Sequence, residues 1–116
     1  GGPVELVGVY AGLGAYFSFN WHRLGAPAGS ARAERFQALV RAFPEERLLV
    51  ETDAPAMPLP AERRRFALPA RVDGTEVAHP ADLVAAQAGL AELRGAEPAA
   101  LEGRLEGNFH ALFGPA

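Results

Sequence analysis

Apolar residues in the first half of the chain recur at spacings that predict helix, strand, helix and strand in turn. The segment PVELVGVYAGLG (3–14) repeats them every three or four residues, as one face of a helix does. AYFSFN (15–20) alternates instead, with its phenylalanines on one face, which is typical of a strand. SARAERFQALVRAF (30–43) returns to helical spacing, and Ser30 is its candidate N-cap.

The second half begins with RLLVET (47–52), whose apolar centre predicts a strand buried on both faces. Four prolines and an arginine run then mark residues 54–78 as a loop, long enough to be functional or mobile. Two further helices are predicted over 80–95 and 98–114, each with a proline at its start. The apolar stripe of the last helix is expected to be Leu101, Leu105, Leu112 and Phe113.

This order of elements predicts an α/β protein. A strand–helix–strand unit gives two parallel strands joined by a right-handed crossover. Two parallel strands are too few for a domain, because they need further strands beside them and cover on both faces. We therefore expect residues 1–116 to be a C-terminal fragment of a single α/β domain whose earlier strands lie outside this sequence.

Composition narrows the function classes. With 49% apolar and 22% charged residues in 116, the chain fits one soluble globular domain or a piece of one. A net charge of -3 gives no overall basic field that would attract nucleic acid or membrane. The absence of cysteine excludes disulfides, thiolate metal sites and cysteine nucleophiles. No apolar run reaches the ~20 residues of a membrane span, so we expect a cytoplasmic protein without a membrane partner.

Candidate chemistry lies where the two predicted strands end, since α/β folds place their sites at the carboxyl ends of parallel strands. Strand alternation puts Glu51 and Asp53 on one face, with Asp53 nearer the mouth of the site. A carboxylate there can bind a divalent cation, or orient a metal-bound water and take its proton. The alternative is that Asp53 caps a turn, because Asp before Ala-Pro is common turn chemistry.

Three segments together carry a family resemblance: RLLVETDAP after the strand AYFSF, then HPADLVAAQAGLAELRG, then NFHALFG. In order and spacing they resemble the TatD family of metal-dependent hydrolases, a TIM-barrel branch related to amidohydrolases. The resemblance implies that the chain is the C-terminal part of a (β/α)₈ barrel. Residues 15–20 and 47–52 would be its seventh and eighth strands.

The resemblance also implies a role for Asp53 as a metal ligand that helps to activate water. The cofactor would be one or two divalent ions, Mg, Mn or Zn, and the substrate DNA or another phosphodiester, cut in a 3′–5′ exonuclease-like manner. The family's other ligands have no counterpart here, so the remaining barrel strands would be required for a folded site. The chain alone is then expected to be inactive. Glu51 is expected to be a buried carboxylate, held by hydrogen bonds or by an arginine, that supports Asp53 from one layer below.

Five further residues are candidate substrate contacts. His22 follows the first strand, and His79 precedes the helix predicted from residue 80. Arg63, Arg64 and Arg65 lie in the loop after Asp53, where phosphate contacts on DNA would give them a purpose. Surface histidines and a solvated charge run are the alternatives.

Departures from the family pattern affect substrate choice more than the metal site. Trp21 stands where many relatives have glycine, which adds bulk at the mouth, and Ala78 and Asp82 replace two asparagines. Two other functions stay open. The chain could be a non-catalytic module that pairs through an exposed strand edge, or part of an amidohydrolase relative that cleaves an ester or amide.

Overall fold

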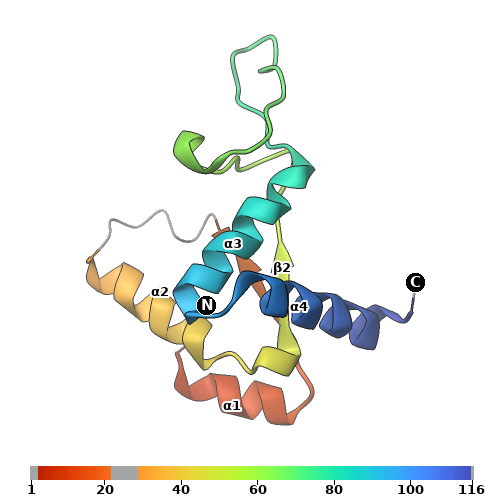
Figure 1. Cartoon of the computed structure of the whole chain (residues 1–116). Helices are drawn as coiled ribbons and strands as arrows, with labels where there is room; N and C mark the ends of the chain where they lie inside the picture. The colour runs from red at the N-terminus through yellow and green to blue at the C-terminus, as the bar shows by residue number, and fades with distance from the viewer. Residues whose placement is uncertain (1–2, 22–28, 116) are drawn as a thin grey trace.

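The structure is a computed structural model that describes residues 3–21 and 29–115 (Figure 1). Its helices and strands are α1 (Glu5–Gly12), β1 (Phe17–Asn20), α2 (Ala31–Ala42), β2 (Leu48–Glu51), α3 (Leu83–Arg94) and α4 (Pro98–Phe113). Single 3₁₀ turns, among them Glu45–Arg47, Ala61–Arg63 and Pro80–Asp82, lie between them. The predicted order of helices and strands is confirmed.

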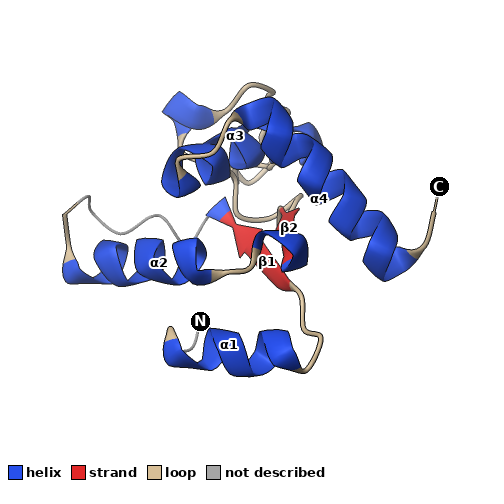
Figure 2. Ribbon diagram, turned by 60° about the horizontal axis from the view of Figure 1, so that its bottom comes forward, coloured by secondary structure: helices blue, strands red, loops and turns tan. Residues whose placement is uncertain are grey.

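The two strands pair in parallel, as the strand–helix–strand order predicts. Phe17 lies opposite Leu48 and Asn20 opposite Glu51. In Figure 2 the strands lie between α3 and α4 above and α2 and α1 below. Side chains of α2, α3 and α4 all pack into one core cluster with the strands. The long loop after β2 extends past the carboxyl ends of the strands, at the top of Figure 1.

The core forms between one face of the strands and the helices. Phe19 of β1, Leu48 of β2 and Leu90 of α3 are almost fully buried in one cluster. Each such side chain contributes about 1.5–3 kcal/mol relative to leaving it exposed. The opposite face of the sheet carries Ser18, Asn20 and Glu51 together with Leu49, so it is mostly polar.

The prediction that β2 is buried on both faces is wrong for this chain. Leu48 is buried, but Leu49 and Val50 are only partly buried and Glu51 is exposed. The reason is that the sheet has only these two strands among the residues that the structure describes. Each strand therefore keeps an open edge.

The apolar stripe predicted for α4 is confirmed only in its first half. Leu101 and Leu105 are buried, whereas Leu112 and Phe113 are 45% and 66% exposed. The last turns of α4 extend past the strands, as Figure 2 shows, so nothing covers them there. Asn108 takes the next inward position, and its side-chain amide donates to the carbonyls of Glu45 at 2.7 Å and Leu48 at 2.8 Å.

Local signals fix the helix ends. The Oγ of Ser30 accepts a hydrogen bond from the N–H of Ala33 at 3.2 Å, which confirms the predicted N-cap. Gly95 ends α3 with a φ of 61°, a conformation that glycine adopts without strain. In the described part of the chain, no helix combines the length and apolar character that crossing a bilayer requires.

Candidate functional site

Two side-chain hydrogen bonds join β1 to β2 and to the residues just after it, on the mostly polar face of the sheet. The hydroxyl of Ser18 donates to Glu51 Oε2 at 2.7 Å. The amide of Asn20 donates to Asp53 Oδ2 at 2.6 Å. Glu51 and Asp53 therefore share a face, as strand alternation predicts. The second bond lies at the carboxyl edge, and the first lies one layer below it.

The Asn20 contact leaves Asp53 Oδ1 as the carboxylate oxygen that can bind a cation. Hard divalent cations such as Mg²⁺ take carboxylate oxygens, so the donor fits the ion that the family resemblance implies. Within residues 3–21 and 29–115, no group of three or more His, Cys, Asp or Glu side chains is close enough to hold a metal. Asp53 could thus supply one ligand, and further ligands would have to come from outside these residues.

Glu51 differs from its predicted environment. It is exposed, and its partner is the Ser18 hydroxyl instead of an arginine. The expectation of burial is wrong for this chain because the sheet face that carries Glu51 has no covering strand in the described residues. Its placement one layer below Asp53 is as predicted, and a supporting role stays a prediction.

A small cavity lies behind the carboxyl edge. Its wall includes Asn20, Trp21, Asp53, Met57 and His79. Its volume is about 10 Å³, roughly what a single water requires. The cavity therefore places His79, from the start of the α3 segment, against the same space as Asp53.

The cavity wall is shaped by a contact between Trp21 and α3. Trp21 is buried, and its ring lies so close to Gly89 that a Cβ on that glycine would fall 1.4 Å from Cζ3. The Trp21 ring also meets Phe19 edge-to-face at 6.1 Å. Trp21 therefore packs into the core of the α3 side, and this burial leaves its ring no open face for a base.

Asp82 anchors the long loop, a role that the sequence reading did not find. Its buried carboxylate accepts hydrogen bonds from the backbone N–H groups of Arg65 and Phe66, both at 3.0 Å. The loop residues meet Asp82 from 17 and 16 positions earlier in the chain. An acidic residue at a helix start suggests a helix-dipole role, and nothing local in the sequence indicates so distant a partner.

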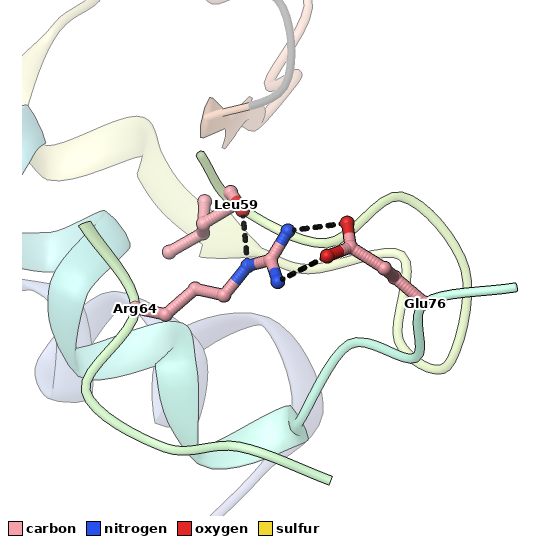
Figure 3. A network of polar contacts seen from close by, with 3 residues as sticks. All are labelled: Leu59, Arg64 and Glu76. Atoms are coloured by element: carbon pink, nitrogen blue, oxygen red, sulfur yellow. Dashed lines mark hydrogen bonds and ion pairs between the residues drawn. The ribbon is translucent and has the colours of Figure 1, made fainter. Parts of the chain in front are cut away.

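Arg64 ties the loop to itself (Figure 3). Its Nη1 and Nη2 donate to Glu76 Oε1 and Oε2 at 3.1 and 2.8 Å, and its Nε donates to the Leu59 carbonyl at 2.5 Å. The hydrogen bond with Arg64 lowers the pKa of Glu76 from its ordinary value of 4.5. The same bond raises the pKa of Arg64. Such a two-pronged pair fixes direction as well as distance.

Comparisons with known proteins place this geometry in a family. The sequence model of the family described as TatD related DNase matches residues 1–114. The chain belongs to the TatD family. It is therefore a chain of a hydrolase family, as the sequence resemblance predicts. No curated protein matches the sequence significantly.

Two solved structures show the fold of this TatD-family chain. YjjV, a TatD homolog from Escherichia coli K12, is 22% identical and superposes with a TM-score of 0.72 over 100% of this chain and 39% of its own. A TatD-family hydrolase from Entamoeba histolytica is 12% identical, with a TM-score of 0.73 over 98% of this chain and 40% of its own. The predicted fold class, part of a TIM barrel with two parallel strands and flanking helices, is confirmed. The chain spans about two fifths of the length of these structures.

The candidate substrate contacts of the TatD-family chain do not form one patch. Arg64 is engaged by Glu76, while the guanidinium of Arg63 lies 4.9 Å from the Trp21 ring centroid. Arg65 is exposed and contributes its backbone N–H to the Asp82 anchor. His22 lies outside the described residues. Of the described members of this set, His79 alone lies in the wall of the cavity beside Asp53.

Proposed function

We propose that this chain contributes part of the active site of a metal-dependent phosphodiester hydrolase, with Asp53 as a metal ligand. The supporting observation is the Asn20–Asp53 hydrogen bond at the carboxyl edge of the sheet. It orients a carboxylate at the place where α/β barrels carry their catalytic groups. The family-model match to TatD related DNase supports a nuclease reaction.

In this proposal, Asp53 has two tasks. The carboxylate would help to hold the cation, and it would orient the attacking water and accept a proton from it. Asn20 keeps Oδ2 occupied, so that the carboxylate presents one defined oxygen. A bound divalent ion, Mg, Mn or Zn, supplies Lewis acidity and lowers the pKa of a bound water. Glu51 supports this arrangement from the layer below.

The proposed substrate is DNA, cut in a 3′–5′ exonuclease-like manner. Arg65 would contact flanking phosphates, as would Arg63 and Arg64 if their ion pairs with Glu92 and Glu76 opened. His22 and His79 complete the set of proposed contacts. Each arginine contact would weaken with salt, because binding a phosphate releases counterions.

The whole site is proposed to need the remaining barrel strands as a structural partner. Both open edges of the sheet lie beside grooves with apolar side chains: Phe19 and Val40 at the β1 edge, and Leu49 and Leu105 at the β2 edge. Pairing there would bring the missing ligands to Asp53. The chain alone is therefore proposed to be inactive. Its β1 and β2 edges would stay unpaired and could pair with strands of other chains.

The test compares the 116-residue chain with a polypeptide that also carries the remaining barrel strands. Both are assayed with single-stranded DNA and with small esters and amides, with and without chelator. We expect chelator-sensitive DNA hydrolysis by the longer polypeptide alone. Activity on esters but not DNA would favour the amidohydrolase alternative. A longer polypeptide inactive on all substrates, with a chain that binds another protein, would favour a non-catalytic module.

A further inference from the structure

We propose that His79 donates a hydrogen bond from Nε2 to an anionic phosphoryl oxygen of the substrate. This inference rests on the proposed function and assigns a second group to the same site. It starts from the position of His79 in the wall of the cavity that Asp53 also lines. The two residues come from different elements, so their proximity follows from the fold alone.

The hydrogen bond on the other ring nitrogen fixes the tautomer of His79. Its Nδ1 accepts from the backbone N–H of Ala81 at 3.0 Å. A nitrogen that accepts a hydrogen bond carries no proton, so the neutral ring must carry its proton on Nε2. Within residues 3–21 and 29–115, the hydrogen bond of the imidazole is the one at Nδ1. The ring therefore offers a donor.

The orientation of the ring is also fixed. The Phe66 ring lies 5.3 Å from the His79 ring, centroid to centroid, at an interplanar angle of 32°. Phe66 is itself held, because its N–H donates to the buried Asp82 carboxylate at 3.0 Å. Asp82 lies only three positions after His79 in the chain. The buried Asp82 carboxylate therefore holds the Phe66 backbone next to the His79 imidazole. A donor fixed in this way loses little entropy when it binds.

The cavity wall also carries the carboxylates of Glu51, Asp53 and Asp82, so an anionic oxygen would enter only when a divalent cation offsets their charge. A volume of about 10 Å³ admits roughly one water-sized group, such as a single non-bridging phosphoryl oxygen. An N–H donor stabilises negative charge on such an oxygen and strengthens as charge develops. It would do little for a nucleophilic water, which needs an acceptor to take its proton. Asp53 is that acceptor, and His79 is the complementary donor.

The competing interpretation is that His79 only caps the 3₁₀ turn Pro80–Asp82, through Nδ1. The two roles separate by substitution. In His79→Asn the amide oxygen can still accept from Ala81, so the cap is retained and the distant donor is lost. His79→Ala removes both. His110→Asn is the matched control, because His110 lies on α4 and contacts Glu106 and Gly114.

The first measurement is the tautomer. Long-range ¹H–¹⁵N correlation spectra of the polypeptide that carries the remaining barrel strands, recorded where the imidazole is neutral, report which ring nitrogen carries the proton. We expect Nε2–H as the dominant form for His79. Dominant Nδ1–H would overturn the proposal, since the donor would then face its own backbone.

The second measurement is phosphate binding. Calorimetry is done with inorganic phosphate and the polypeptide that carries the remaining barrel strands. We expect His79→Asn and His79→Ala to weaken binding about 10- to 100-fold, the range for one hydrogen bond to a charged group. His110→Asn should bind as the unmodified protein does. Unchanged binding in His79→Asn would overturn the donor role.

Different variants test the role of His79 and the proposed function. If Asp53→Asn leaves DNA hydrolysis intact, the proposed function fails, whatever His79 does. If Asp53→Asn abolishes hydrolysis while His79→Asn changes neither phosphate binding nor KM, only the His79 inference fails. The expected result is a loss of hydrolysis in Asp53→Asn and a raised KM in His79→Asn.

Discussion

Asn20 holds the carboxylate of Asp53 through a 2.6 Å hydrogen bond between side chains 33 positions apart. In the sheet register Asn20 lies opposite Glu51, so its amide reaches diagonally to the residue two positions further along the chain. The position of Asp53 at the carboxyl edge thus depends on the parallel pairing of β1 and β2. The bond couples the fold to the candidate site directly.

Asn20→Ala is expected to weaken metal binding about 10- to 100-fold in the polypeptide with the remaining barrel strands. This is the range for losing a residue that orients a metal ligand. The freed Asp53 carboxylate would sample several orientations, and its affinity for Mn²⁺ would fall. Calorimetric titration with Mn²⁺ measures the effect.

Ser18→Ala is the matched control for Asn20→Ala. It removes a hydrogen bond of similar length, 2.7 Å, but to Glu51, one layer below. We expect a smaller loss of Mn²⁺ affinity than for Asn20→Ala. Equal losses in both variants would show that the polar face acts as a whole and that Asn20 has no special relation to Asp53.

Acidification should loosen the long loop, because Arg64 lowers the pKa of Glu76 from its ordinary 4.5. A carboxylate with a lowered folded pKa stabilises the fold above its unfolded value and loses that contribution as pH falls through the folded value. The loop contact should therefore persist at neutral pH and disappear progressively below about pH 4.5. The Arg64 side-chain N–H signals in NMR spectra follow it.

Glu76→Gln should remove that pH step and leave the loop loosened at every pH. The variant is needed because Asp73 in the same loop also has a lowered pKa, through the backbone N–H of Thr75. A step that survives in Glu76→Gln would assign the pH dependence to Asp73 instead.

Gly89→Ala is expected to destabilise the chain strongly. Its Cβ would come within 1.4 Å of the Trp21 ring, which is itself buried. Overpacking of this kind costs about 1–3 kcal/mol and occasionally more. Urea unfolding of the polypeptide with the remaining barrel strands measures the change in the free energy of unfolding.

Gly103→Ala is the control, because a Cβ at that position of α4 meets nothing within 4 Å. It should stabilise the chain by about 0.5–1 kcal/mol through the higher helix propensity of alanine. The Trp21→Leu change should partly rescue Gly89→Ala. If Gly89→Ala were as mild as Gly103→Ala, the close Trp21 contact would be contradicted.

Patterns with a local cause predicted much of the fold. The Ser30 cap and the alternation in AYFSFN each depend on neighbours a few positions away, and the structure confirms the cap and a strand over Phe17–Asn20. The shared face of Glu51 and Asp53 follows from strand alternation in the same way. Helical spacing also predicted the buried face of the first half of α4. Leu101 and Leu105 are buried there, where α4 packs against β2.

Features that depend on distant partners could not be predicted. Leu112 has the spacing of a core residue, but α4 extends beyond the sheet and Leu112 is exposed. The extent of the sheet depends on strand pairing, which the spacing of residues within α4 does not show. Asp82 and Arg64 look like surface charges, yet they anchor the long loop through partners up to 17 positions away. Trp21 was expected to add bulk at the mouth, and the complementary gap at Gly89 is visible only in the structure.

The central claim, that Asp53 is a metal ligand of a phosphodiester hydrolase, is tested most directly by comparing Asp53→Asn with Asp73→Asn. Both variants are made in the polypeptide with the remaining barrel strands and assayed for chelator-sensitive hydrolysis of single-stranded DNA. Asp73 lies in the long loop and accepts from the Thr75 N–H at 2.9 Å, which an asparagine oxygen can also do. The account predicts that Asp53→Asn lowers kcat/KM by at least about 100-fold, the upper end for residues that merely support a ligand. Asp73→Asn should stay near the unmodified value, and full metal-dependent activity in Asp53→Asn would contradict the account.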